Sequence, residues 1–146
     1  MKVRISVAGV TGVALLDSGS SHNFIDVNMA QRAGVRLIPC PNLSVTVANG
    51  DRVASPGKAL AQSVHIGNEA FDIDFYALPL GAYDMVLGVQ WLSSLGPILW
   101  NFAKHTMCFA RWKTHYMARH GLLTRAHVVI PDEPRRRSPG CAARGV

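Results

Sequence analysis

Hydrophobic and polar residues alternate over much of the first 112 positions of this sequence. Val3, Ile5 and Val7 alternate with polar neighbours, which predicts a strand with one buried face, and residues 9–12 should form the turn after it. Residues 13–16 should return as a strand that is buried on both faces. The other segments expected to be extended cover residues 35–38, 43–47, 59–66, 69–77, 85–87, 98–102 and 106–110.

Two short helices are expected between these strands. Asp26 can cap a helix over residues 27–33, and Gly34 is typical of the position where such a helix stops. Hydrophobic residues between positions 91 and 95 mark one face of a second helix, which ends at Gly96. Many short strands, few helical residues and no internal repeat predict an all-β fold.

The strongest local signal is a hairpin over residues 43–57. Hydrophobic and polar residues alternate before Asn49-Gly50, and this dipeptide is the most typical hairpin turn in proteins. The pattern alone leaves open whether the hairpin covers a binding site or is an ordinary surface hairpin.

The candidate chemistry lies in the stretch Leu15-Leu16-Asp17-Ser18-Gly19. A hydrophobic strand that ends on Asp17 brings a carboxylate out of the sheet into a tight turn, for which Gly19 supplies backbone freedom. Because aspartate, serine and glycine are common turn residues, the stretch by itself also fits an ordinary strand exit.

A series of motifs resembles the retropepsin-like aspartic proteases, most of all the protease segment of gypsy-type long-terminal-repeat retrotransposon polyproteins. The likeness covers roughly residues 3 to 110. The matching segments are residues 15–19, 21–25 (Ser-His-Asn-Phe-Ile), 47–50 (Val-Ala-Asn-Gly), 86–88 (Val-Leu-Gly), 90–92, 95–98 and 100–102.

This resemblance implies the retropepsin-like acid protease fold, a small closed β-barrel with a flap hairpin and one or two short helices. It also implies peptide hydrolysis by a water held between two aspartates, which share one proton because like charges about 3 Å apart cannot both ionise. The sequence has a single Asp-Ser-Gly, so one chain can supply only half of such a site. We therefore expect a homodimer in which Asp17 of each chain meets on the two-fold axis.

The residues expected to act are those that match the family's motifs. Asp17, Ser18 and Gly19 form the expected catalytic loop, in which Ser18 bonds across the dimer axis. The expected substrate-binding residues are Ser20, Ala48, Asn49, Gly50, Val86, Leu87 and Gly88. Neither a cofactor nor a metal is expected, because the aspartate pair needs none. His22 is interpreted as a loop residue rather than a base, and Asp72 and Asp74 as residues on the solvated face of a strand.

Charge divides the chain into two parts. Residues 1–112 carry eight Lys/Arg and seven Asp/Glu, a net +1, whereas residues 113–146 carry seven and two, a net +5. Periodicity fades after residue 112, so we expect a protease domain over residues 1–112 and a basic, mostly disordered tail or linker over 113–146. The tail could contact nucleic acid weakly and nonspecifically.

Further expectations concern location and redox state. The sequence has no hydrophobic run of about 18 residues and no signal-peptide core, so we expect an intracellular, cytoplasmic protein without membrane contact. Cys40, Cys108 and Cys141 are odd in number and lack metal-ligand spacing, which favours reduced thiols.

Two other function classes compete with the protease hypothesis. A catalytically degenerate domain could keep the fold and act as a peptide- or protein-binding dimerisation module, since a fold does not guarantee an activity. A nucleic-acid-binding β-barrel is less favoured, because the first 112 residues are nearly neutral and lack a strand face that combines aromatic and basic residues.

Overall fold

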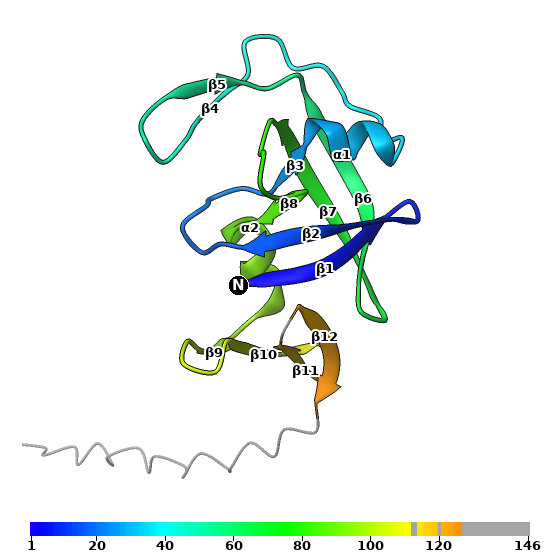
Figure 1. Ribbon diagram of the computed structural model, residues 1–146, viewed down its shortest axis with the longest axis vertical. Helices are drawn as coiled ribbons and strands as arrows, with labels where there is room; N and C mark the ends of the chain where they lie inside the picture. The colour runs from blue at the N-terminus through cyan, green and yellow to red at the C-terminus, as the bar shows by residue number, and fades with distance from the viewer. Residues whose placement is uncertain (112–113, 120, 127–146) are drawn as a thin grey trace, which may run out of the picture.

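A closed six-stranded barrel forms the centre of the computed structural model, which describes residues 1–111, 114–119 and 121–126 (Figure 1). The strands follow the order β1, β2, β8, β3, β7, β6 around the barrel, and β6 pairs again with β1. Their bounds are β1 Lys2–Val7, β2 Val10–Leu16, β3 Phe24–Asp26, β6 Lys58–Ile66, β7 Glu69–Leu78 and β8 Met85–Leu87. This architecture confirms the predicted all-β class with a closed barrel.

Alternation along the strands places the hydrophobic residues inside the barrel. Val3, Ile5 and Val7 are all buried, as their period of two predicts, and Ile73 and Phe75 of β7 are buried in the same core. Asp72 and Asp74 are exposed on the opposite face of β7, which confirms the interpretation of these two aspartates as solvated strand residues.

The short strand β8 is the structural element behind the Asp17 loop. It pairs parallel with β2 on one side, where Leu16 lies opposite Leu87, and antiparallel with β3 on the other. All three of its residues are buried, which explains why Met85-Val86-Leu87 is continuously hydrophobic rather than alternating. The chain leaves β2 at Asp17 directly beside the end of β8.

Both predicted helices are present and short. The first, α1 (Val27–Arg32), starts at Asp26, whose side chain accepts hydrogen bonds from the backbone N–H groups of Asn28 and Met29. The second, α2 (Val89–Leu92), follows β8 and continues into the 3-10 turn η1 (Ser93–Leu95). No helix in the described part of the chain has the length and hydrophobicity required to cross a membrane.

The hairpin predicted over residues 43–57 is confirmed, with a longer turn than expected. Strands β4 (Ser44–Thr46) and β5 (Arg52–Ala54) pair with Val45 opposite Val53. Val47 N–H donates to the Asp51 carbonyl at 2.9 Å, and the Asn49 side chain bonds Asp51 twice, so five residues rather than two form the loop.

The first turn of the chain lies earlier than predicted. Strand β2 begins at Val10, and Ala8 and Gly9 form the turn with φ of 48° and 80°. Gly12 lies within β2, where a Cβ atom would come within 2.9 Å of the Asp84 side chain. The expected turn over residues 9–12 was therefore wrong: Gly12 is a strand residue, and glycine is needed there because the Asp84 side chain packs against it.

The C-terminal strands correct the predicted domain boundary. A four-stranded sheet in the order β12-β11-β10-β9 contains β9 (Ile98–Asn101) and β10 (Thr106–Arg111), which were predicted, together with β11 (Thr114–Arg119) and β12 (Leu122–Ala126), which were not. Tyr116, Ala118 and Leu123 belong to the buried core. Packed structure thus continues beyond residue 112, and the part of the expected tail beyond residue 126 lies outside the described residues.

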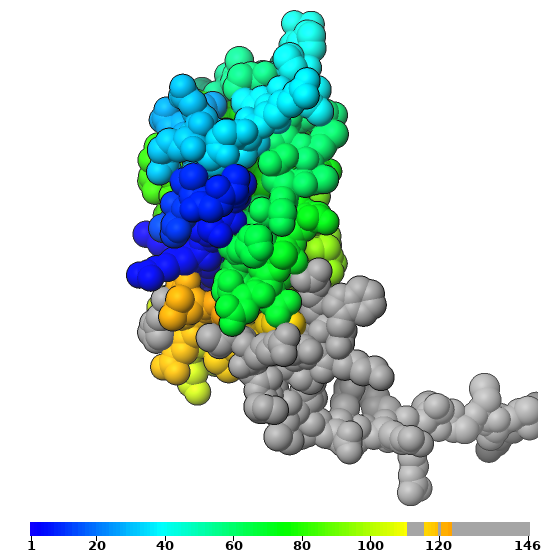
Figure 2. All heavy atoms as spheres, turned by 90° about the vertical axis from the view of Figure 1, so that its right-hand side faces the viewer, coloured from blue at the N-terminus to red at the C-terminus, as the bar shows by residue number. Residues whose placement is uncertain are grey.

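These added strands are joined to the barrel at two places. Gly121 bridges to Val3, and the Arg4 N–H donates to the Gly121 carbonyl at 2.8 Å. At Gly67, in the β6–β7 turn, a Cβ atom would lie 2.3 Å from the Leu123 carbonyl oxygen. Figure 2 shows the C-terminal strands, in orange, packed beneath β1 in blue and beside the end of the β6–β7 hairpin in green.

Candidate active site

The carboxylate of Asp17 is held by its own loop. The Gly19 N–H donates to Asp17 Oδ1 at 2.9 Å, and the Ser20 hydroxyl donates to Asp17 Oδ2 at 2.8 Å. The Asp17 N–H donates to the Leu87 carbonyl at 3.0 Å, which ties the start of the loop to β8. Each carboxylate oxygen therefore has a fixed donor, while the side chain as a whole stays half-buried and open to solvent.

The far end of the loop is fixed on the segment that joins β8 to α2. The Val89 N–H donates to the Ser20 carbonyl at 2.7 Å, and the Gln90 N–H donates to the Ser21 carbonyl at 3.2 Å. At Gly88, an added Cβ atom would lie 2.3 Å from the His22 carbonyl oxygen and 2.4 Å from that of Ser20. Only glycine allows this close approach.

A buried asparagine completes this arrangement. Asn23 is 2% exposed, and its Oδ1 accepts a hydrogen bond from the Gly88 N–H at 2.9 Å. Its Nδ2 donates to the Asp74 carbonyl of β7 at 3.2 Å. A buried amide with both ends bonded is a rigid cross-link, so Asn23 connects the loop to β7 as well as to β8.

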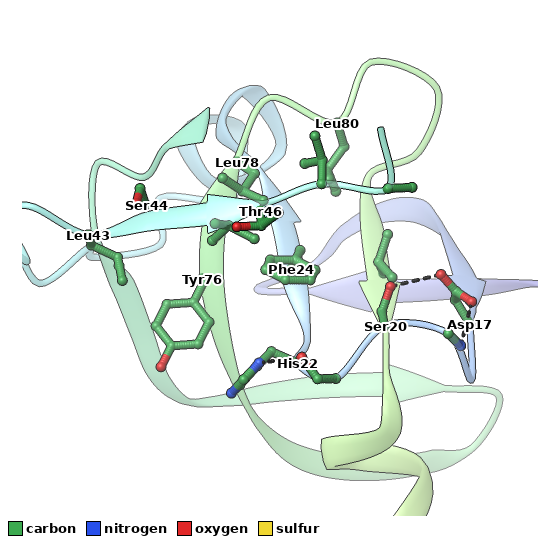
Figure 3. A pocket seen from close by; sticks show the side chains of 16 residues that line it. Asp17, Ser20, His22, Phe24, Leu43, Ser44, Thr46, Tyr76, Leu78 and Leu80 are labelled. Carbon is green, nitrogen blue, oxygen red and sulfur yellow. Dashed lines mark hydrogen bonds between the residues drawn. The ribbon is translucent and has the colours of Figure 1, made fainter. Parts of the chain in front are cut away.

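A pocket of about 820 Å³ lies between the Asp17 loop and the β4–β5 hairpin. Figure 3 shows Asp17 and Ser20 at one end and His22 and Tyr76 at the other, with Phe24 between them. The lining residues are Asp17, Gly19, Ser20, Ser21, His22, Phe24, Leu43, Ser44, Val45, Thr46, Val47, Ala48, Tyr76, Leu78, Leu80 and Val86. Hydrophobic walls interspersed with a small number of polar groups are typical of ligand-binding pockets.

The structure brings some of the predicted site residues together around this pocket. Asp17, Gly19, Ser20, Ala48 and Val86 all line it. Their expected roles in catalysis and substrate binding stay predictions, but their common location agrees with them.

Other predicted residues lie elsewhere. Ser18 is exposed, and its hydroxyl has no hydrogen-bond partner among the described residues. Asn49 and Gly50 lie exposed at the tip of the hairpin and do not line the pocket of the single chain. Leu87 is 0% exposed, and Gly88 is buried beneath the loop. Neither residue lines the pocket, and both contact the Asp17 loop, so the expected direct substrate contact by Leu87 and Gly88 stays a prediction.

Several pocket residues were not singled out from the sequence. Tyr76, Leu78 and Leu80 come from β7 and the segment after it, and Leu43 precedes β4. The alternation in β7 places Tyr76 on the face opposite Phe75, but no sequence signal indicates that this face meets the hairpin. Within the described ranges, no three His, Cys, Asp or Glu side chains are grouped as metal ligands.

Comparison with solved structures identifies the class of this fold. The retroviral protease-like domain of Ddi1 from Leishmania major superposes with a TM-score of 0.58 at 17% sequence identity, over 75% of this chain and 87% of that chain. A retropepsin-like aspartic protease from Rickettsia conorii gives a TM-score of 0.48 at 20% identity, over 68% of this chain and 75% of that chain. The barrel, the Asp17 loop and the hairpin opposite it define a retropepsin-like domain.

The sequence identifies the family within this class. Residues 13–118 match the family model of the PEG10/RTL1 protease domain. The chain therefore belongs to this retrotransposon-derived family of retropepsin-like aspartic protease domains. Among curated proteins, none matches the sequence significantly.

Proposed function

We propose that this chain is an aspartic endopeptidase of gypsy-type retrotransposon origin, which cleaves polypeptides as a homodimer. The observation that carries the proposal is the Asp17 carboxylate, fixed by the Gly19 N–H at 2.9 Å and the Ser20 hydroxyl at 2.8 Å at one end of a pocket of about 820 Å³. That pocket has room for several side chains of an extended peptide. Processing of a polyprotein is the corresponding biological role.

In the proposed mechanism, Asp17 of each chain contributes one carboxylate to a pair that holds one water and shares one proton. The ionised carboxylate takes a proton from the water as its oxygen attacks the peptide carbonyl, and the protonated carboxyl donates its proton toward the carbonyl oxygen. Collapse of the tetrahedral intermediate breaks the C–N bond, and the amine leaves with a proton. Water is the only reactant besides the peptide.

The loop geometry suits this role. Hydrogen bonds from Gly19 and Ser20 hold the carboxylate in one orientation before substrate arrives, so little reorganisation is needed in the transition state. The exposed Ser18 hydroxyl, which has no partner within the described part of one chain, is available to bond the partner's loop. The β4–β5 hairpin supplies the opposite wall and closes over the peptide.

Two exposed hydrophobic side chains, Leu99 in β9 and Phe102 in the turn after it, support the homodimer. Leu99 and Phe102 have the highest exposures among the large hydrophobic residues of the described chain, 71% and 77%. In Figure 1 the turn after β9 projects toward the same side of the barrel as the loop after β2 and the tip of the β4–β5 hairpin. A two-fold axis beside the Asp17 loop brings this side against its copy, so we place Leu99 and Phe102 in the dimer interface.

Dilution of the purified protein tests the shared site. Cleavage of a fluorogenic peptide, expressed per chain, should fall as the protein is diluted below its dimer dissociation constant, because monomers hold half a site. The midpoint of this dilution curve is the concentration at which half of the activity per chain is lost. In a chain with both Leu99→Asp and Phe102→Asp, it should move to at least about tenfold higher concentration, because the added carboxylates would repel each other across the interface.

The matched control is Leu60→Asp, which adds the same charge at an exposed hydrophobic position of β6. It should leave the midpoint unchanged. A rate strictly proportional to concentration, down to dilutions where sedimentation shows only monomer, would exclude the shared site. An unchanged midpoint in the chain with Leu99→Asp and Phe102→Asp would show that these two residues lie outside the dimer interface.

A further inference from the structure

The end of the pocket remote from Asp17 carries a histidine and a tyrosine in contact. The rings of His22 and Tyr76 meet edge to face, with their centroids 5.4 Å apart and an interplanar angle of 77°. Figure 3 shows the Tyr76 hydroxyl and the His22 ring at the same end of the pocket, across Phe24 from Asp17. Neither residue has a part in the proposed hydrolysis, so their presence in the lining calls for another role.

The neighbouring serine fixes the histidine ring. Ser21 Oγ lies 2.8 Å from His22 Nδ1, which leaves Nε2 without a partner among the described residues. When the serine hydroxyl donates to Nδ1, the neutral ring carries its proton on Nε2, and the protonated ring carries one there as well. In this neutral tautomer, as in the protonated ring, Nε2 is a hydrogen-bond donor, and the Tyr76 hydroxyl is a second donor at the same end of the pocket.

The charges around this end favour an anionic partner. His22 is the basic residue of the pocket lining, and Asp17, at the opposite end, is the acidic one. Lys58 lies directly opposite Tyr76 in the pairing of β6 with β7, so its side chain projects from the same face. Asp74 also shares that face of β7 and keeps its negative charge, although its Oδ1 accepts the Ala61 N–H at 2.7 Å. Neither Lys58 nor Asp74 lines the pocket, so the charge difference within the pocket is that between His22 at this end and Asp17 at the other.

We propose that His22 and Tyr76 bind a carboxylate side chain of the substrate, an aspartate or glutamate at a position removed from the scissile bond. The inference rests on the proposed function, since it assigns a substrate preference to that same site. Repulsion from Asp17 keeps a substrate carboxylate away from the catalytic end, while His22 attracts it at the other. The hydrophobic lining residues Leu43, Val45 and Leu78 accommodate uncharged side chains.

A peptide library tests this assignment and locates the cleavage site in the same experiment. The full chain is incubated with a mixture of peptides from a digested proteome, and the residues around each new cleavage are counted. We expect enrichment of glutamate and aspartate at one position. Synthetic peptides of the best-cleaved sequence are then made with Glu, Gln or Leu at that position. Their kcat/KM should decrease in this order, and the value for Glu should exceed that for Leu about five- to tenfold.

Variants show whether an acidic preference comes from His22 and Tyr76 or from another part of the pocket. His22→Leu should bring the Glu-to-Leu ratio close to one, and Tyr76→Phe should lower it in part. The matched control is His65→Leu, at an exposed position of β6 outside the pocket, which should keep the full ratio. Equal rates for Glu and Gln would overturn the carboxylate assignment, and a ratio unchanged by His22→Leu would overturn the role of the histidine.

A binding measurement distinguishes failure of the inference from failure of the proposed function. The same library is passed over the immobilised Asp17→Asn chain, and retained peptides are identified by mass spectrometry. Retention of acidic peptides that His22→Leu abolishes would support the inference even if the natural chain cleaved nothing. Cleavage without an acidic preference would support the proposed function and contradict the inference.

Discussion

Replacement of Asp17 by asparagine is expected to lower kcat/KM for peptide hydrolysis by at least about 10³-fold. Asparagine is nearly isosteric with aspartate, and its carbonyl oxygen can still accept one of the hydrogen bonds that the Gly19 N–H and the Ser20 hydroxyl donate to Asp17. It cannot take a proton from the water or share one with its counterpart. The measurement is the initial rate on a denatured polypeptide, with circular dichroism to verify that the variant folds.

The control for this variant is Asp72→Asn. Asp72 is an exposed aspartate on β7 and lies outside the pocket, so its replacement should change the rate by less than about twofold. If the Asp17→Asn variant hydrolysed the polypeptide as fast as the unaltered chain, another group would have to perform the hydrolysis. Complete inactivity of the unaltered chain, with peptide binding preserved, would favour a degenerate binding module instead.

The second large effect is expected at Gly88. A methyl group there would lie 2.3 Å from the His22 carbonyl oxygen and 2.4 Å from the Ser20 carbonyl oxygen, and both are backbone atoms that cannot turn aside. Gly88→Ala should therefore displace the loop that follows Asp17, at a cost of about 1–3 kcal/mol in the free energy of unfolding. Since a displacement of about 1 Å misplaces the reacting groups, activity should fall by about 10²-fold.

Gly34→Ala provides the comparison for this variant. Gly34 has a φ of +64°, but a Cβ atom there meets nothing within 4 Å. Its replacement should cost about 1 kcal/mol because of the backbone conformation, while the rate per folded molecule stays unchanged. Urea denaturation gives the stabilities of both variants, and rates corrected for the folded fraction give the activities. If Gly88→Ala kept full activity, the close packing at Gly88 would not be what positions the catalytic loop.

Local patterns were sufficient to predict most of the elements. The period of two in β1 and β7, the cap at Asp26 and the Asn49-Gly50 hairpin all depend on neighbouring residues, so the sequence displays them directly. The same holds for the Asp17 turn, whose residues supply their own hydrogen bonds.

Features that depend on distant partners could not be predicted in this way. Asn23 is bonded to Asp74 and Gly88, which are 51 and 65 positions away in the sequence, so its role emerges only in the fold. The pocket wall formed by Tyr76 likewise depends on where β7 meets the hairpin. For β11 and β12, interspersed basic residues obscured the alternation, and the bridge from Gly121 to Val3 is a contact between the two ends of the domain.

The central claim is that two copies of Asp17 share one active site, and mixing tests it most directly. Unaltered and Asp17→Asn chains are combined in different proportions at constant total concentration, allowed to exchange subunits, and assayed for peptide cleavage. If only dimers with two aspartates are active, the rate should follow the square of the unaltered fraction, so that an equal mixture retains about a quarter of full activity. A rate directly proportional to that fraction, with an equal mixture at about half, would show that each chain works alone and would contradict the account.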